Sequence, residues 1–94
     1  MTEITKEAVN ALSTFTEFNK GNTSVGVYGR VASMSLHGYI IAVNNGEVYF
    51  VTDAGHKTAT TKERLNGIPG VHIVQRNGDW YLNGDLWDGS IKKI

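Results

Sequence analysis

The segment AGHKTATTKERLNG, residues 54–67, gathers side chains that can bind an anionic partner. It contains His56, Lys57, Lys62 and Arg64 within a short stretch of polar residues, which we call the basic edge. Cationic donors of this kind can dock the phosphates of a nucleic acid or an acidic protein surface. The same segment can equally be a solvated crossover, because Asp53 and Glu63 neutralise much of its charge.

Residue types that support catalysis are sparse elsewhere. The three histidines, His37, His56 and His72, lack the HxH or HxxxH spacing that would bring two of them to one metal, and the chain has no cysteine. Asp85 and Asp88 flank a tryptophan in GDLWDGS, but aspartates among glycines more often form turns. We therefore expect a non-enzymatic protein with no catalytic residue, no metal and no cofactor.

Two aromatic residues complete the predicted contact set. Tyr49 lies in a predicted strand, and Trp87 lies near the C-terminus, where it is expected to be the least buried of the large aromatics. Partly exposed aromatic side chains often anchor protein interfaces. The predicted partner-binding residues are His56, Lys57, Lys62, Arg64, Tyr49 and Trp87.

Composition limits the classes of partner. The 94 residues include nine acidic and nine basic side chains, so the formal net charge is zero. A protein that binds nucleic acid mainly through phosphates usually carries a positive excess, so the balance argues against that role. The N-terminal MTEITKEAVN has no apolar core of a signal peptide, and no apolar run approaches the length of a membrane span. We expect one cytoplasmic domain over residues 1–94 that does not contact a membrane.

Residues 3–19 have the period of an amphipathic helix. Apolar side chains recur at steps of three and four, and Thr2 or Thr5 can cap the start while Gly21 follows the end. The apolar stripe consists of Ile4, Ala8, Ala11, Leu12, Phe15 and Phe18.

From residue 24 the apolar period changes to two, which predicts strands over about 24–53 and 71–83. Residues 24–36 form either one long strand or two pieces joined at Gly29. Three pairs are predicted to be two-residue hairpin loops: His37–Gly38, Asn45–Gly46 and Asn77–Gly78. The Asn–Gly pairs are the strongest of these signals, because a type I′ turn needs positive φ at both positions.

These loops assign the faces of the predicted sheet. The core face is expected to carry Met34, Leu36, Tyr39, Ile41, Val43, Val48 and Phe50, and in the C-terminal hairpin Val71, Ile73, Trp80 and Leu82. The second face, with Ser33, Ser35, Ile40, Ala42, Tyr49 and Val51, is more apolar than a solvated face. Either the C-terminal hairpin or the short helix covers it, or a partner does. A homodimer that buries Ile40, Tyr49 and Val51 is one alternative.

A short crossover helix is predicted over 61–66. Thr60 and Glu63 fit a capping box, Gly67 can provide a left-handed C-cap, and Pro69 prevents continuation. Leu65 would then pack inward, with Lys62 and Arg64 facing out. The predicted fold class is α+β: an N-terminal helix packed on an antiparallel sheet of about five strands, which is a meander plus the C-terminal hairpin.

The pattern TTKERLNG, WYLNG and WDG, at residues 60–67, 80–84 and 87–89, resembles a family of small bacteriophage-encoded proteins. The resemblance covers about the last two-thirds of the chain and leaves out the N-terminal helix. It implies an accessory protein in the host cytoplasm and supplies no catalytic residue. Small proteins of this origin commonly bind and block a host protein or a bacterial defence complex, which is our leading hypothesis. The alternative is a small nucleic-acid-binding module that uses the basic edge.

Overall fold

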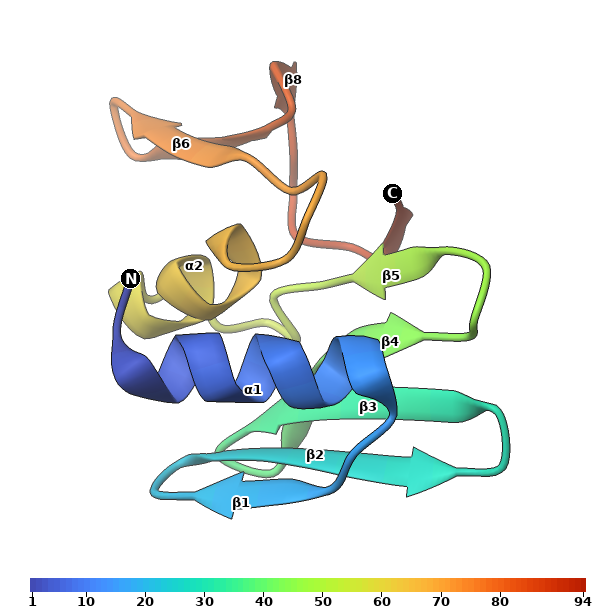
Figure 1. Ribbon diagram of the computed structural model, residues 1–94. Helices are drawn as coiled ribbons and strands as arrows, with labels where there is room; N and C mark the ends of the chain where they lie inside the picture. The colour runs from blue at the N-terminus through green and yellow to red at the C-terminus, as the bar shows by residue number, and fades with distance from the viewer.

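The computed structural model describes residues 1–94 and has an α+β fold, as predicted (Figure 1). The main sheet is antiparallel, in the order β1-β2-β3-β4-β5-β9, and a second antiparallel sheet has the order β6-β7-β8. The elements are α1 (Glu3–Thr14), β1 (Phe18–Lys20), β2 (Thr23–Tyr28), β3 (Val31–Leu36), β4 (Tyr39–Asn44), β5 (Tyr49–Val51), α2 (Ala59–Asn66), β6 (Ile73–Arg76), β7 (Asp79–Leu82), β8 (Asp85–Leu86) and β9 (Lys92–Lys93).

Helix α1 begins where the sequence predicts and ends earlier. The Thr2 hydroxyl caps it by accepting a hydrogen bond from the amide of Thr5. The helix stops at Thr14 instead of residue 19, because Phe15 adopts a left-handed conformation with φ of 54° and its amide bonds to the carbonyl of Ala11. Phe18 lies in β1 and pairs with Val25 of β2. This strand was not predicted, because Phe18 also fits the helical spacing of apolar residues.

Two of the predicted hairpin loops are confirmed. His37–Gly38 and Asn77–Gly78 have positive φ at both positions and connect strands in the expected register. A further two-residue loop after Tyr28 divides residues 23–36 into β2 and β3, as the two-piece alternative required. The Asn45–Gly46 prediction is wrong in register, because Asn44 pairs with Tyr49. The Asn45 side chain accepts from the amides of Glu47 and Val48, which closes a longer loop.

A β-bulge at the start of β4 overturns the predicted face assignment. Met34 pairs with Ala42 instead of Ile41, so the extra residue reverses the faces of the remainder of β4. Ala42 and Val51 consequently lie in the core and Val43 and Phe50 on the opposite side, the reverse of the prediction.

The prediction of one sheet made of the meander plus the C-terminal hairpin is wrong, because the hairpin is not part of the main sheet. It forms its own sheet with β8 and lies beyond α2, away from α1 (Figure 1). Its predicted inward face is correct, because Val71, Ile73, Trp80 and Leu82 are all buried. These side chains join those of α1, α2 and the main sheet in one apolar cluster, so α2 is packed between two sheets.

Helix α2 is longer than predicted and capped differently. Its N-cap is Thr58, whose hydroxyl accepts from the amide of Thr61, and Glu63 is therefore free of the predicted capping box. Gly67 has helical dihedral angles instead of the predicted left-handed ones. Its lack of a side chain allows the end of α2 to approach α1 closely. A Cβ at Gly67 would lie 2.6 Å from Thr5 Cγ2 and 2.9 Å from Val9 Cγ2 of α1.

We expect Gly67→Ala to lower the free energy of unfolding by about 1–2 kcal/mol, because the added methyl group overpacks the contact between the helices. Thr5→Ser removes the nearer methyl group and keeps the hydroxyl, so Gly67→Ala should be less damaging in that background. Urea unfolding of the two single variants and the double variant measures this coupling. Equal costs of Gly67→Ala in both backgrounds would contradict the packing explanation.

Candidate binding surfaces

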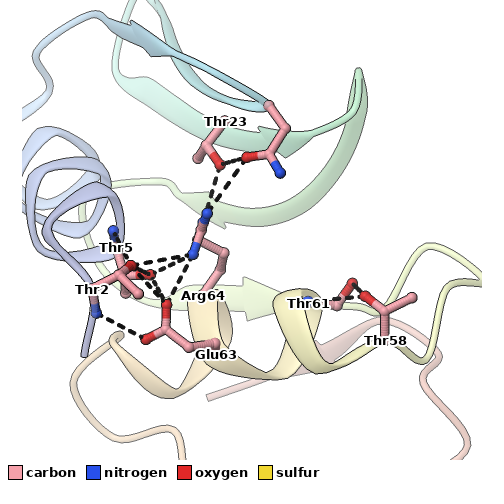
Figure 2. Close-up of polar contacts among 8 residues, drawn as sticks. Thr2, Thr5, Thr23, Thr58, Thr61, Glu63 and Arg64 are labelled. Atoms are coloured by element: carbon pink, nitrogen blue, oxygen red, sulfur yellow. Dashed lines mark hydrogen bonds and ion pairs between the residues drawn. The ribbon is translucent and has the colours of Figure 1, made fainter.

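The basic edge does not form an exposed cationic surface. Arg64, which was predicted to face out, is only 6% exposed. Its guanidinium Nε donates to Thr23 Oγ1 at 3.0 Å, and its Nη1 donates to Thr5 Oγ1 and Glu63 Oε1, each at 2.8 Å (Figure 2). The acceptors come from β2, α1 and α2. They replace the water that the guanidinium group loses when it is buried.

Glu63 is the second member of this network. Its carboxylate accepts hydrogen bonds from the hydroxyls of Thr5 and Thr2 and lies beside the Arg64 guanidinium (Figure 2). Desolvation raises the pKa of Glu63, but the hydrogen bonds from Thr5 and Thr2 and the charge of Arg64 lower it by more. The net pKa therefore lies below the ordinary value of 4.5.

Lys57 is engaged in a second internal contact. Its ammonium donates to Asp53 Oδ2 at 2.6 Å and to the carbonyl of Asp88 at 2.7 Å. The Asp53 side chain is buried, and its other oxygen accepts from the amide of Gly55. A Cβ at Gly89 would lie 1.9 Å from Asp53 Oδ2, so only glycine permits this approach. The contact fastens the C-terminal segment to the loop after β5.

Lys62 and the two tryptophans form a third contact. The Lys62 ammonium donates to Gln75 Oε1 at 2.9 Å and lies 5.7 Å from the ring centroid of Trp80. Trp87 packs against Trp80 with ring centroids 6.3 Å apart, and its indole N–H donates to the carbonyl of Ser90. Trp87 is 6% exposed, contrary to the prediction that it would be the least buried large aromatic.

His56 and Tyr49 occupy separate places. His56 is exposed and lies against the ring of Tyr39, with ring centroids 4.8 Å apart. Tyr49 is half-buried on the core side of β5, and its carbonyl accepts from the amide of Ile94. The structure therefore brings Lys57, Lys62 and Trp87 close together around Trp80, whereas the side chains of Arg64, His56 and Tyr49 contact other residues.

A cleft of about 330 Å³ lies beside His56. The turn between β3 and β4 contributes His37 to its lining, the start of β4 contributes Tyr39 and Ile41, and the first turn of α2 contributes threonines. Sequence analysis did not predict this cleft, because it exists only where folding brings residues 36–41 against residues 53–61.

The side of the main sheet opposite α1 is not covered by a helix or by the second sheet (Figure 1), and we call it the bare face. Tyr28 is 79% exposed there and Ile40 is 51% exposed. From β1 to β5 no residue on this face carries a charge, and the only charged residue is Lys93 on the edge strand β9. By strand register the bare face consists of Asn19, Ser24, Gly26, Tyr28, Val31, Ser33, Ser35, Ile40, Val43, Phe50 and Lys93.

A shallow apolar depression marks the end of the bare face. Ile91, which precedes β9 and is largely exposed, lines it together with Ile40, Val43 and Phe50. Neither the C-terminal hairpin nor α2 covers this area, so Ile40 of the predicted second face lacks the internal cover that was one of the alternatives. The bulge at Ile41 explains why the composition of the face was mispredicted. No helix in the structure combines the length and apolar character needed to cross a membrane.

We expect Arg64→Ala to lower the free energy of unfolding by about 3 kcal/mol, because it leaves Glu63 and several hydroxyls without their partner. Arg30→Ala, at an exposed turn position, is the matched control and should change stability by less than about 0.5 kcal/mol. Urea unfolding at neutral pH provides both values. Similar small losses for the two variants would show that the buried network contributes little.

Glu63 should make stability depend on pH. Because its pKa is lower in the folded protein than the ordinary value of 4.5, its contribution is present above that value and is lost as pH falls through the folded pKa. Glu63→Gln should therefore be less stable than the wild type at pH 7, and the difference should shrink below pH 4.5. The pKa of Asp88 is also lowered, by hydrogen bonds from Ser90, so the difference between the two proteins is the quantity to measure by urea unfolding. A difference that is constant with pH would refute the assignment.

Comparison with known proteins identifies a family. No curated protein and no solved structure matches the chain. The family model described as Kyanoviridae Gp96 protein matches residues 1–93, so the match includes α1, which the sequence resemblance left out. The expectation of a small phage-encoded family is thereby confirmed. The chain belongs to the Kyanoviridae Gp96 protein family, a family of phage proteins.

Proposed function

We propose that this phage protein acts by binding a host protein or a bacterial defence complex and inhibiting it through occupancy of its surface. The observation that supports the proposal is the exposed bare face, whose residues on β1 to β5 carry no charge. The solvent-facing side of an antiparallel sheet normally carries polar side chains. Large exposed apolar areas commonly mark interaction sites.

The chemistry of the bare face favours a protein partner. Protein interfaces are depleted of charge at their centre and enriched in aromatic residues, and the bare face has this character with Tyr28 and Phe50. A partner surface that is itself apolar and uncharged would complement it. A single-strand nucleic-acid platform would instead need basic residues among the rings, and here Lys93 is the only one on the face.

The cations of the basic edge are poorly placed for the alternative of nucleic-acid binding. Arg64 is buried, and Lys57 and Lys62 are each bound to an acceptor within the chain. Contact with phosphates would require these side chains to leave partners that they already have. The bare face therefore replaces the basic edge as the proposed contact surface.

Ile40→Lys should abolish partner binding, because it places a charge where the interface would exclude water. A loss of about 2 kcal/mol or more, roughly thirtyfold in affinity, is the scale expected for a central apolar contact. Leu86→Lys is the matched control, since Leu86 is also an exposed aliphatic residue on a strand, 68% exposed on β8. Tagged wild-type and variant proteins are used to capture proteins from host lysate with and without nuclease. Circular dichroism checks that each variant is folded.

The expected result is one stoichiometric host protein that the wild type and Leu86→Lys retain and Ile40→Lys loses, with or without nuclease. The purified partner should then lose activity when the wild-type protein is added. Capture that is insensitive to Ile40→Lys would contradict the proposed surface. Binding that disappears with nuclease and falls steeply with salt would favour the nucleic-acid alternative. A wild-type mass in sedimentation twice that of Ile40→Lys would show a homodimer instead.

A further inference from the structure

The cleft beside His56 provides a second site that shares no residue with the bare face. Its floor is apolar, because Leu36 and Ile41 line it and are almost fully buried. Its rim is aromatic, because Tyr39 remains 54% exposed although it packs against the His56 ring. At about 330 Å³ the cleft is at the lower end of the volumes typical of small-molecule sites.

The acceptor groups of the cleft are already used. Asp53 accepts from Lys57 and from the amide of Gly55, so its charge is paired and both oxygens have partners. The hydroxyls of Thr58 and Thr61 bond to each other, and that of Thr58 also accepts from the Thr61 amide (Figure 2).

Four other side chains of the lining make no hydrogen bond within the protein: the imidazoles of His37 and His56 and the hydroxyls of Tyr39 and Thr60. All four can donate a hydrogen bond, and no uncompensated carboxylate lines the cleft. Several donors around a hollow without free negative charge suit a ligand that carries acceptor oxygens.

The rim adds a second requirement. A planar ring can stack on exposed aromatic side chains, and such stacking on a base contributes about 1–3 kcal/mol. The apolar floor suits the same part of a ligand. We propose that the cleft binds a small molecule that combines a phosphate group with a planar aromatic ring, of the size and chemistry of a nucleoside monophosphate. His37, His56 and Thr60 donate to the phosphate, and Tyr39 contacts the ring.

Titration of the full chain with adenosine monophosphate, monitored by amide chemical shifts in NMR spectra, tests this proposal. Adenosine and inorganic phosphate are titrated separately. Saturable shifts at Tyr39 and Thr60 with a dissociation constant below about 1 mM are expected for the monophosphate. Each of the two fragments should bind at least tenfold more weakly, because each lacks one half of the recognised chemistry.

The variants are chosen to preserve the fold. His56→Phe keeps an aromatic ring against Tyr39 and removes the donors, while His37→Asn suits the positive φ of 52° at that turn. Each should weaken binding at least tenfold. His72→Ala, at the exposed histidine outside the cleft, is the control and should leave affinity within twofold of the wild type.

Three results would overturn the proposal. One is the absence of saturable shifts with adenosine monophosphate up to about 10 mM. Another is adenosine or inorganic phosphate binding as tightly as the monophosphate, since the site would then not require both chemical groups. The third is unchanged affinity in His56→Phe and His37→Asn, which would place the ligand outside the cleft.

Discussion

The burial of Arg64 is the constraint on which the arrangement of the helices depends. A guanidinium group has five donors and a permanent charge, so it can be buried only where acceptors converge. Here they come from three elements: Thr5 of α1, Thr23 of β2 and Glu63 of α2. An eight-residue helix such as α2 is marginal in isolation, and this network fixes its position against α1. An intact buried ion pair often adds little stability over an apolar pair of similar volume, but removing one partner is costly, so Arg64 is needed once the other groups of the network are buried.

The contact among Asp53, Lys57 and Gly89 fixes the position of the C-terminal segment, as the Arg64 network fixes the position of α2. It holds the segment after β8 against the loop after β5, and the amide of Asp53 also donates to the carbonyl of Gly89. Trp80 and Trp87 pack beside it. Their ring centroids lie 5.5 and 5.9 Å from the Lys57 ammonium nitrogen. The conspicuous segments of the sequence, from TTKERLNG to WDG, thus have structural roles that account for their residue types. Their prominence in the sequence indicated tertiary contacts instead of an exposed binding edge.

Local signals predicted the local structure well, and tertiary contacts decided the rest. The start of α1, two of the hairpin loops and the inward face of the C-terminal hairpin follow from caps, glycines and alternation along a few residues. The bulge at Ile41 and the burial of Arg64 depend on partners outside their own segments. The left-handed C-cap at Phe15 is local, but a phenylalanine there has no sequence signal comparable to glycine. A single bulge reversed the face assignment because strand side chains alternate with a period of two. For the same reason the bare face was mispredicted in composition, although exposure of an apolar face was one of the alternatives. The cleft, which forms where residues 36–41 meet residues 53–61, had no signature in the sequence.

The placement of charge links the structure to the kind of recognition it supports. Nine basic residues are available, yet two of the three cations of the basic edge pair with carboxylates of the chain and the third with a glutamine. With Lys57 and Arg64 paired to carboxylates, Lys62 is the remaining uncompensated cation of the basic edge, which leaves little charge for steering an anionic polymer. Apolar contact on the bare face needs no such charge, because it does not depend on counterions and is lost when a charge is inserted. The internal use of the cations is therefore the physical reason to expect recognition of a protein surface by this fold through apolar contact.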